Sequence, residues 1–326
     1  MSAREKYWLV VALAIVASAI WLVRRGSALR PSAVSVEPLA VVPAGPAFVL
    51  SVDLARLRKS KAGLALARAG SEELAKAGKT CGFEPLRDVD QLALAVPGSA
   101  KLDPGAALPA SHEIAVIASG RFVGPVVVDC IARQIQERGG EPVRTTIGSF
   151  ASVRDRRGAG EIAVKNGLFV LSDGPYLRRV LDAAEGHRAD GNESERVRDR
   201  LHAELRRSFG GQAPIIATLA LPEGWLEQAL GDPEVRRSPL ALLRSAALRA
   251  EVSDRVELRA LFACAKSADC DGVEAFLKNV RADLGPALGP ALSKRLAEVS
   301  LQRNGERIEL SGAHAAEETR ALFAPR

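Results

Sequence analysis

Aromatic side chains are scarce in this chain of 326 residues, which has nine Phe, three Trp and two Tyr. Ala, Leu and Val must therefore fill most of the core, although a hydrophobic content of 47% is that of a globular protein. Surfaces that bind nucleic acids interleave basic and aromatic residues, and no stretch of this sequence does so. We therefore expect no nucleic-acid partner.

Recognisable catalytic and cofactor motifs are also missing. No serine occupies a Gly-x-Ser-x-Gly turn. Gly158-Ala159-Gly160 lacks the third glycine of a dinucleotide loop and precedes a predicted strand instead of following one, so we interpret it as a hairpin turn. Cys81 with His112 as its base is a less favoured interpretation than a disulfide or a buried thiol. We predict a non-enzymatic protein without a cofactor.

Metal-binding patterns are incomplete. The four histidines have no second histidine at i+3 or i+4, and we interpret each as an exposed or loop residue: His112, His187, His202 and His314. Asp269-Cys270-Asp271-Gly272 imitates part of a calcium loop, but Ser267 and Lys278 occupy its first and closing ligand positions. We interpret this segment as a helix start capped by Asp271, and we predict no metal site.

One long uncharged run is present near the N-terminus, at residues 7–23. At about 1.5 Å per residue it would span roughly 25 Å as a helix, the short end of what crosses a bilayer core. Trp8 and Trp21 lie near its two ends, where amphipathic rings favour the headgroup level. We predict a membrane anchor over residues 1–26.

A cleavable signal peptide is the alternative, with Ala17-Ser18-Ala19 as its cleavage site and a secreted product. The apolar run continues for four residues past Ala19, which favours the anchor. Much of the net charge of +6 belongs to this end of the chain, because residues 1–30 contain five basic residues and one acidic residue. We expect the body of the protein on the periplasmic side of the cytoplasmic membrane.

The four cysteines are Cys81, Cys130, Cys264 and Cys270. An even number after a membrane segment permits two disulfides in an oxidising compartment. Cys264 ends a predicted strand and Cys270 begins a predicted helix, so we favour this pair, which leaves Cys81 with Cys130. Four buried thiols are the alternative.

The rest of the chain divides by composition and periodicity. Residues 27–46 contain four prolines and are predicted to form an extended tether. We then predict a first α+β unit at 47–186, a linker and helix at 187–212, and a second α+β unit at 213–326. The predicted strands lie at 47–52, 92–96, 113–119, 144–154, 161–164, 168–172, 214–221, 246–252, 256–264, 298–302 and 307–311. The main predicted helices lie at 60–76, 126–138, 176–184, 196–209 and from 271 onward.

The two units share one order of elements, and each contains an Asn-Gly pair between two apolar runs, at Asn166-Gly167 and Asn304-Gly305. Asn-Gly is a strong signal for a β-hairpin, because both turn residues adopt positive φ. We predict a duplicated α+β fold with mostly antiparallel sheets.

Three short segments carry a resemblance to a known group: Val42-Pro43-Ala44, the AFVLSVDLARL run from Ala47, and Cys81-Gly82-Phe83-Glu84-Pro85. The chain resembles uncharacterised membrane-anchored envelope proteins of bacteria. The resemblance covers the first unit and implies no activity.

We predict a membrane-anchored protein that binds another envelope protein or scaffolds a complex, since no site for chemistry is visible. The alternative is a ligand carrier or chaperone, which would need an apolar cleft between the units. The aromatic residues that could line such a cleft are Phe48, Phe83, Phe169 and Trp225. A hydrolase with an unrecognised site is the third hypothesis.

Overall fold

The computed structural model describes most of the chain after the predicted anchor, namely residues 36–61, 63, 85–98, 114–158, 160–172, 174–210, 213–221, 239–288 and 297–315. The predicted anchor and nearly all of the predicted helix at 60–76 lie outside these residues. Within the described ranges, no helix is long and apolar enough to cross a membrane.

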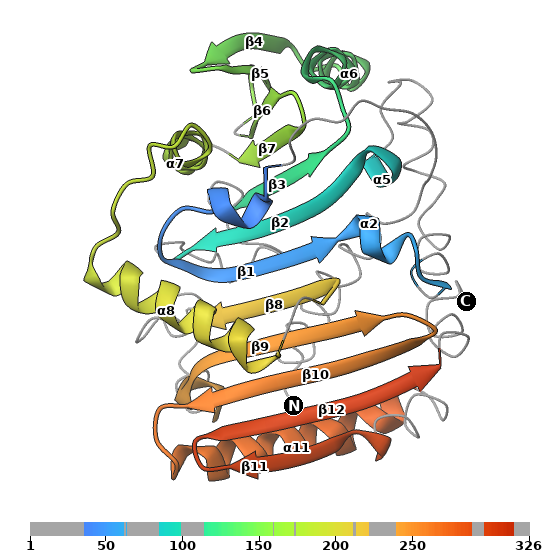
Figure 1. The fold of residues 1–326 in the computed structure, drawn as a ribbon, viewed down its shortest axis with the longest axis vertical. Helices are drawn as coiled ribbons and strands as arrows, with labels where there is room; N and C mark the ends of the chain where they lie inside the picture. The colour runs from blue at the N-terminus through green and yellow to red at the C-terminus, as the bar shows by residue number, and fades with distance from the viewer. Residues whose placement is uncertain are drawn as a thin grey trace.

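Twelve strands of the described residues form one sheet in which every pairing is antiparallel, in the order β11-β12-β10-β9-β8-β1-β2-β3-β7-β6-β5-β4 (Figure 1). Their bounds are β1 Pro46–Asp53, β2 Val89–Pro97, β3 Ala115–Gly120, β4 Pro142–Ile147, β5 Phe150–Asp155, β6 Glu161–Lys165, β7 Leu168–Ser172, β8 Ile215–Ala220, β9 Leu243–Val252, β10 Arg255–Cys264, β11 Ser300–Asn304 and β12 Arg307–Ala315. The predicted α+β class with antiparallel strands is confirmed.

Strands from the two predicted units meet in the middle of the sheet. β1 and β8 pair from Phe48 opposite Leu219 to Val52 opposite Ile215. The sheet therefore continues without interruption from one unit into the other.

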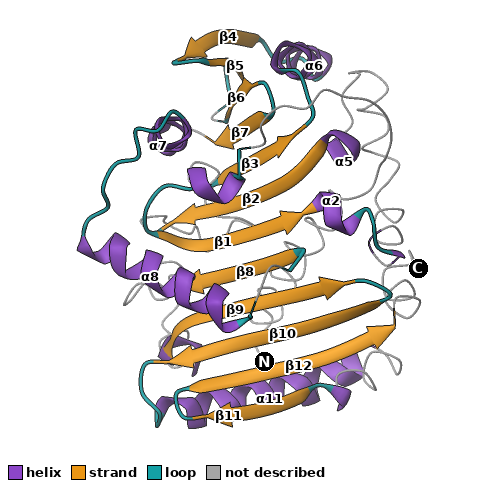
Figure 2. Ribbon diagram, viewed as in Figure 1, coloured by secondary structure: helices purple, strands orange, loops and turns teal. Residues whose placement is uncertain are grey.

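Helices pack on both faces of this sheet (Figure 2). The longer ones are α6 Gly124–Glu137, α7 Gly174–Ala184, α8 Glu193–Ser208 and α11 Asp269–Leu288, and the short ones are η1 Pro38–Val41, α2 Leu54–Leu57, α5 Pro85–Asp88 and η2 Pro239–Leu242. Alternation along β1 separates the two faces, because Leu50 packs in the cluster that contains α6 whereas Val49 packs in the cluster that contains α7. Likewise, on β10, Leu261 packs with α8 and Phe262 packs with α11.

The region predicted as one strand at 144–154 is a hairpin. The chain reverses at Gly148-Ser149, and β4 pairs with β5 from Pro142 opposite Asp155 to Ile147 opposite Phe150. Gly148 adopts φ +57°, which glycine tolerates without the steric cost that a side chain would add. The strand prediction was wrong here because apolar and β-branched residues lie on both sides of the turn and suit a single strand as well as two.

The end of the predicted tether is also packed and not extended. Residues 38–41 form η1, and Val41 and Val42 are buried against the sheet and α7. Proline at the first helical position suits a helix start, so proline content alone was a poor guide to extended structure here.

Both predicted Asn-Gly hairpins form. β6 and β7 pair up to Lys165 opposite Leu168, so Asn166 and Gly167 make the two-residue turn. In the second hairpin Asn304 pairs with Arg307, which moves the turn one residue further, to Gly305 and Glu306. Gly167 and Gly305 both have positive φ, at +77° and +60°.

Candidate functional site

The helix α8 carries a polar network that runs from an exposed capping box to the buried His202. It begins with a capping box in which the Glu195 amide donates to the Asn192 side chain and the Asn192 amide donates to the Glu195 carboxylate, both at 2.9 Å. The predicted helix start at 196 was therefore three residues late. Arg179 of α7 joins the network by donating to Glu195 at 3.0 Å.

Side chains one turn further along α8 bind the start of β1. The Gly45 amide donates to Asp199 Oδ1 at 3.0 Å, and Arg198 Nε donates to the Gly45 carbonyl oxygen at 2.9 Å. Gly98 leaves room for the Arg198 guanidinium, because a Cβ at residue 98 would lie 2.7 Å from it. The network therefore fixes the turn between η1 and β1 against α8.

His202 lies at the centre of this contact and is 6% exposed. Its Nε2 atom is 2.9 Å from the Pro46 carbonyl oxygen, which can only accept, so Nε2 carries the proton. Nδ1 then accepts from the Thr218 hydroxyl at 2.7 Å. Burial lowers the pKa of His202 and keeps the ring neutral. The interpretation of His202 as an exposed histidine was wrong, because sequence spacing did not reveal that this residue faces β8.

We expect His202 to make the protein less stable in acid. The unfolded chain binds a proton at His202 with a pKa of about 6.5, and the folded state has a lower pKa. The unfolded state therefore binds more protons, and the free energy of unfolding should fall as the pH drops below about 6.5. Denaturant melts between pH 5 and 8 should show a smaller slope for His202→Gln. The matched control is His187→Gln, which changes an exposed residue and should keep the wild-type slope.

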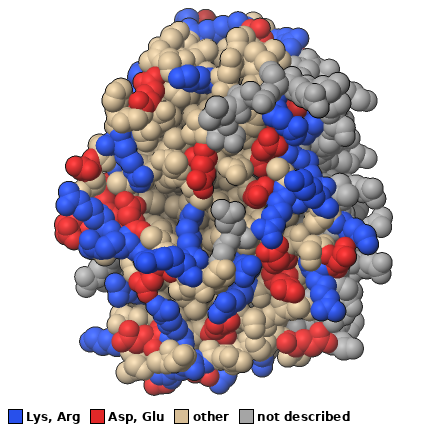
Figure 3. Space-filling view, in the orientation of Figure 1, with Lys and Arg blue, Asp and Glu red and all other residues tan. Residues whose placement is uncertain are grey.

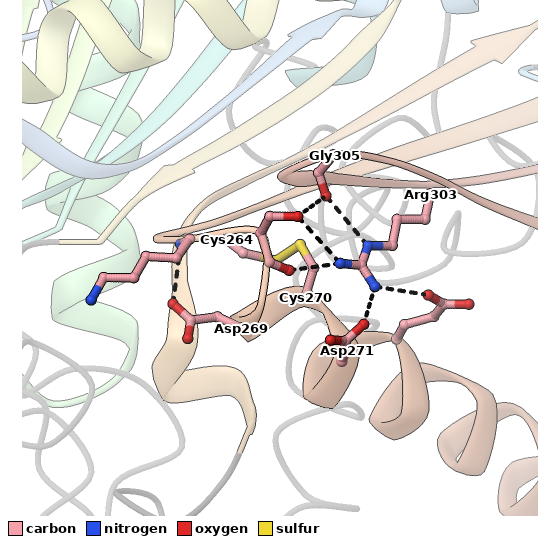
Figure 4. Close-up of a disulfide and its surroundings, with 9 residues drawn as sticks. Cys264, Asp269, Cys270, Asp271, Arg303 and Gly305 are labelled. Carbon is pink, nitrogen blue, oxygen red and sulfur yellow. Dashed lines mark hydrogen bonds and ion pairs between the residues drawn. A yellow bond between two sulfur atoms is a disulfide. The ribbon is translucent and has the colours of Figure 1, made fainter.

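The predicted pair Cys264 and Cys270 forms a disulfide with a Cα–Cα distance of 5.6 Å (Figure 4). Both residues are buried, in the cluster that packs α11 on β10 and β12. Arg303 of β11 closes the site by donating to the Ser267 carbonyl oxygen at 2.7 Å and pairing with Asp271. Cys130 is disulfide-bonded as well, whereas Cys81 lies outside the described residues.

Removing the Cys264–Cys270 disulfide should cost about 2 kcal/mol of stability, because it closes a short loop. We expect the free energy of unfolding of the double variant Cys264→Ala/Cys270→Ala to be lower by that amount, so that the variant unfolds at a lower denaturant concentration. Equilibrium unfolding in urea measures the effect. If the variant is as stable as the wild type, the disulfide does not constrain the unfolded chain.

The helix α11 begins at Asp269, two residues before the predicted cap. Asp269 accepts from the Lys266 amide at 3.1 Å, while Asp271 lies in the first turn. Glu274 pairs with Lys278 at 2.7 Å and does not take part in a capping box. Across the described ranges, no group of three or more His, Cys, Asp or Glu residues is arranged to hold a metal ion.

A shallow pocket of about 90 Å³ lies on the other side of α8 from His202, among the described residues. This volume is far below the roughly 300–1,000 Å³ of typical ligand sites. Its lining mixes apolar and polar side chains and includes the ion pair between Arg307 and Glu204 at 2.5 Å. The lining residues are Leu201, Glu204, Leu205, Arg244, Ser245, Leu261, Ala263, Cys264, Glu306 and Arg307.

One constellation resembles a serine–lysine pair, which sequence spacing did not reveal. Lys165 Nζ is 3.0 Å from Ser149 Oγ, and that hydroxyl donates to Glu185 at 2.6 Å. Both Ser149 and Lys165 are exposed, whereas an amine that acts as a base needs burial to lose its proton. The hydrogen bonds from Ser149 lower the pKa of Glu185. The arrangement ties the β4–β5 turn to the end of α7 and does not activate a nucleophile.

The aromatic residues proposed to line a cleft do not meet in one. Phe48 and Phe169 are partly buried and pack against the core cluster beneath α6. Phe83 and Trp225 lie outside the described residues. On the face shown in Figure 3, basic and acidic side chains are interspersed. Ion pairs of the described residues include Arg259 with Glu309 and Arg56 with Glu251.

The edge of the sheet at β4 is the described surface best suited to another chain. α6 packs beside it and carries Val126, which is 41% exposed and among the most exposed large apolar side chains of the described part. Asp129 of α6 pairs with Arg144 of β4 at 2.6 Å. Val126 lies three residues before Asp129 and therefore on the same side of the helix, toward β4.

No protein-family model matches this sequence, and no curated protein matches it. Two solved structures align with most of this chain. Crystal form III of TP0453 aligns with a TM-score of 0.51 and 13% identity over 89% of this chain and 99% of the TP0453 chain. Crystal form I of TP0453 aligns with a TM-score of 0.47 and 12% identity over 89% and 97% of the two chains. At this identity the likeness shows a similar fold and no function.

Proposed function

We propose that this chain is a membrane-anchored extracytoplasmic protein of the non-enzymatic, interaction or scaffolding type. The observation that carries the proposal is the edge surface, which we define as β4 together with Val126 of α6. No described strand pairs with the outer side of β4, and exposed apolar side chains beside such an edge are typical of surfaces that bind another polypeptide. Nucleic acid is not part of the proposal.

A photo-reactive residue at position 126 of the full chain in native membranes tests the interaction role. Because Val126 belongs to the edge surface, irradiation should cross-link it to a protein partner that mass spectrometry identifies. The matched control is the same residue at position 278 on α11, where the Lys278 side chain is 57% exposed. An equal or empty result at both positions would count against the interaction role.

We propose separately that residues 7–23 stay in the cytoplasmic membrane and that the body lies in the periplasm. If the segment is cleaved, the body is secreted instead. The disulfides support it, because they form and persist in oxidising compartments. Protease added to spheroplasts should digest the body and spare cytoplasmic controls. A fully protected body would overturn the assignment.

The small pocket beside α8 favours a second candidate function, the binding of a small ligand. Its lining combines the exposed Arg244 with apolar residues such as Leu261, so a small molecule with one acidic group and a short apolar part is the ligand to test. Heat of binding on titration with short fatty acids, lost in Arg244→Ala, would support this alternative.

We also propose that the two units arose by duplication. Outward from the β1–β8 pair, one side runs β1-β2-β3-β7-β6 and the other β8-β9-β10-β12-β11. On each side the third strand pairs with the last strand of an Asn-Gly hairpin, and a helix precedes that hairpin in sequence. The β4–β5 hairpin would then be an insertion in the first unit. Superposing the two halves in a crystal structure tests this: the hairpins should coincide.

A further inference from the structure

We propose that β4 pairs with β4 of a second copy of this chain, antiparallel and centred on Thr145, so that the two sheets become one. This inference deepens the proposed interaction role and rests on it, since it names the partner of the edge surface. Three features of β4 support this pairing: the direction in which its backbone hydrogen-bonding groups point, the register that these groups permit, and the charges along the edge.

The phase of the ladder shows which backbone groups of β4 are unused. The Arg156 amide donates to the Glu141 carbonyl oxygen at 2.9 Å, which places this pair in hydrogen-bonding positions. Hydrogen-bonded pairs recur at every second residue of an antiparallel ladder, so Val143, Thr145 and Ile147 bond toward β5. The N–H and C=O groups of Arg144 and Thr146 therefore point away from the sheet, where no described strand pairs with β4.

A register centred on Thr145 uses all four of these backbone groups, the N–H and C=O of Arg144 and of Thr146. Arg144 would exchange two hydrogen bonds with Thr146 of the second copy, and the two-fold axis repeats the exchange. Val143 would lie opposite Ile147 of the second copy, and Thr145 opposite its own equivalent, in the closely spaced pairs. Apolar and Thr–Thr cross-strand pairs stabilise antiparallel sheets. The strand is therefore complementary to itself.

The charges of the edge agree with this register. Arg144 is the only charged residue of β4, and it would face Thr146 and not a second arginine. Its charge is already balanced by Asp129 of its own α6 at 2.6 Å. The opposite edge strand, β11, offers no such match, because a register centred on Gln302 would place Arg303 opposite Leu301. Arg303 is also bound to α11 and its preceding turn.

Cysteine cross-linking of the full chain in its membrane tests the register. In Thr145→Cys the two thiols would belong to a closely spaced pair with Cα atoms about 4.5 Å apart, which a disulfide spans. In Thr146→Cys the Cα atoms would be about 8 Å apart, beyond disulfide reach. The described native cysteines, Cys130, Cys264 and Cys270, are already bonded. We expect an oxidised dimer from Thr145→Cys at least about ten times more abundant than from Thr146→Cys.

Charge variants at residue 146 separate pairing from a loss of folding. In Thr146→Lys each Arg144 would face a lysine of the second copy, a pair of like charge. In Thr146→Glu each Arg144 would face a glutamate, a pair of opposite charge. Residues 144 and 146 are both exposed. We expect Thr146→Lys to weaken dimerisation about ten-fold in sedimentation of the detergent-solubilised full chain. Thr146→Glu should dimerise at least as well as the wild type.

Four results would overturn the inference. Equal cross-linking at positions 145 and 146 would exclude this register, and equal dimerisation of the Lys and Glu variants would exclude the Arg144 contact. A cross-link from Thr145→Cys to a different protein would exclude a second copy as the occupant while supporting the interaction role. A chain recovered with no partner at all would count against both.

Discussion

Replacing Phe150 by alanine is expected to lower the free energy of unfolding by about 3–5 kcal/mol. Phe150 is the first residue of β5, is 1% exposed, and is among the largest fully buried side chains of the described part. It packs in the cluster beneath α7 with Ile147 and Leu177, and the Lys165 ammonium lies 5.7 Å from its ring centre. Removing the ring leaves a cavity between the β4–β5 hairpin and α7 that neither element can close alone. Equilibrium unfolding in urea measures the loss.

Two control variants show whether the loss of stability in Phe150→Ala comes from the cavity or from any substitution in these hairpins. Phe150→Leu keeps most of the apolar volume and should cost about 1–2 kcal/mol. Leu171→Ala removes a large apolar side chain from β7, but that residue is 36% exposed, so the cost should stay below about 1 kcal/mol. If Phe150→Ala unfolds at the same urea concentration as Leu171→Ala, the Phe150 ring does not pack between β5 and α7.

Replacing Gly45 by alanine is expected to cost about 2–5 kcal/mol. Gly45 adopts φ +70°, where a side chain is strained, and a Cβ there would lie 2.7 Å from the Cα atom of Glu195. Backbone cannot move aside as a flexible side chain can. The turn would have to separate from α8, which would break the hydrogen bonds of Gly45 with Asp199 and Arg198.

Gly210→Ala is the matched control for Gly45→Ala. Gly210 follows α8 and has a similar φ of +66°, but a Cβ there would meet nothing within 4 Å. It should therefore show only the conformational cost, about 1 kcal/mol. The difference between the two variants in thermal or urea unfolding isolates the contact with α8. Equal losses would mean that α8 does not press on this turn.

Local sequence signals were enough for much of the secondary structure. The short apolar run in AFVLSV predicts β1 as a strand buried on both faces, and the spacing of Val127, Val128 and Ile131 predicts α6, because this spacing places one face of a helix in the core. Asn166-Gly167 predicts its hairpin, since the turn itself requires positive φ. Cys264 and Cys270 were predicted as a pair because only a short turn separates the strand from the helix.

Local sequence patterns failed to predict burial where the surroundings of a residue come from an element far away in the chain. His202 has no neighbour in the sequence that indicates burial, and its partners Pro46 and Thr218 come from other strands. Val41 and Val42 follow a proline-rich segment, yet they are buried because the sheet and α7 offer an apolar surface. The reversal at Gly148 was missed because apolar and β-branched residues on both sides of it suit a single strand as well as two.

The sequence by itself thus determined the α+β class, the two Asn-Gly hairpins and the disulfide at the start of α11. Each of these depends on contacts between residues close in the chain. Only the tertiary structure decided that β1 and β8 meet at the centre of one sheet and that β4 lies at its edge. Alternation shows which residues share a face of a strand, but the neighbour of that strand depends on which distant surfaces pack together with least unfilled volume.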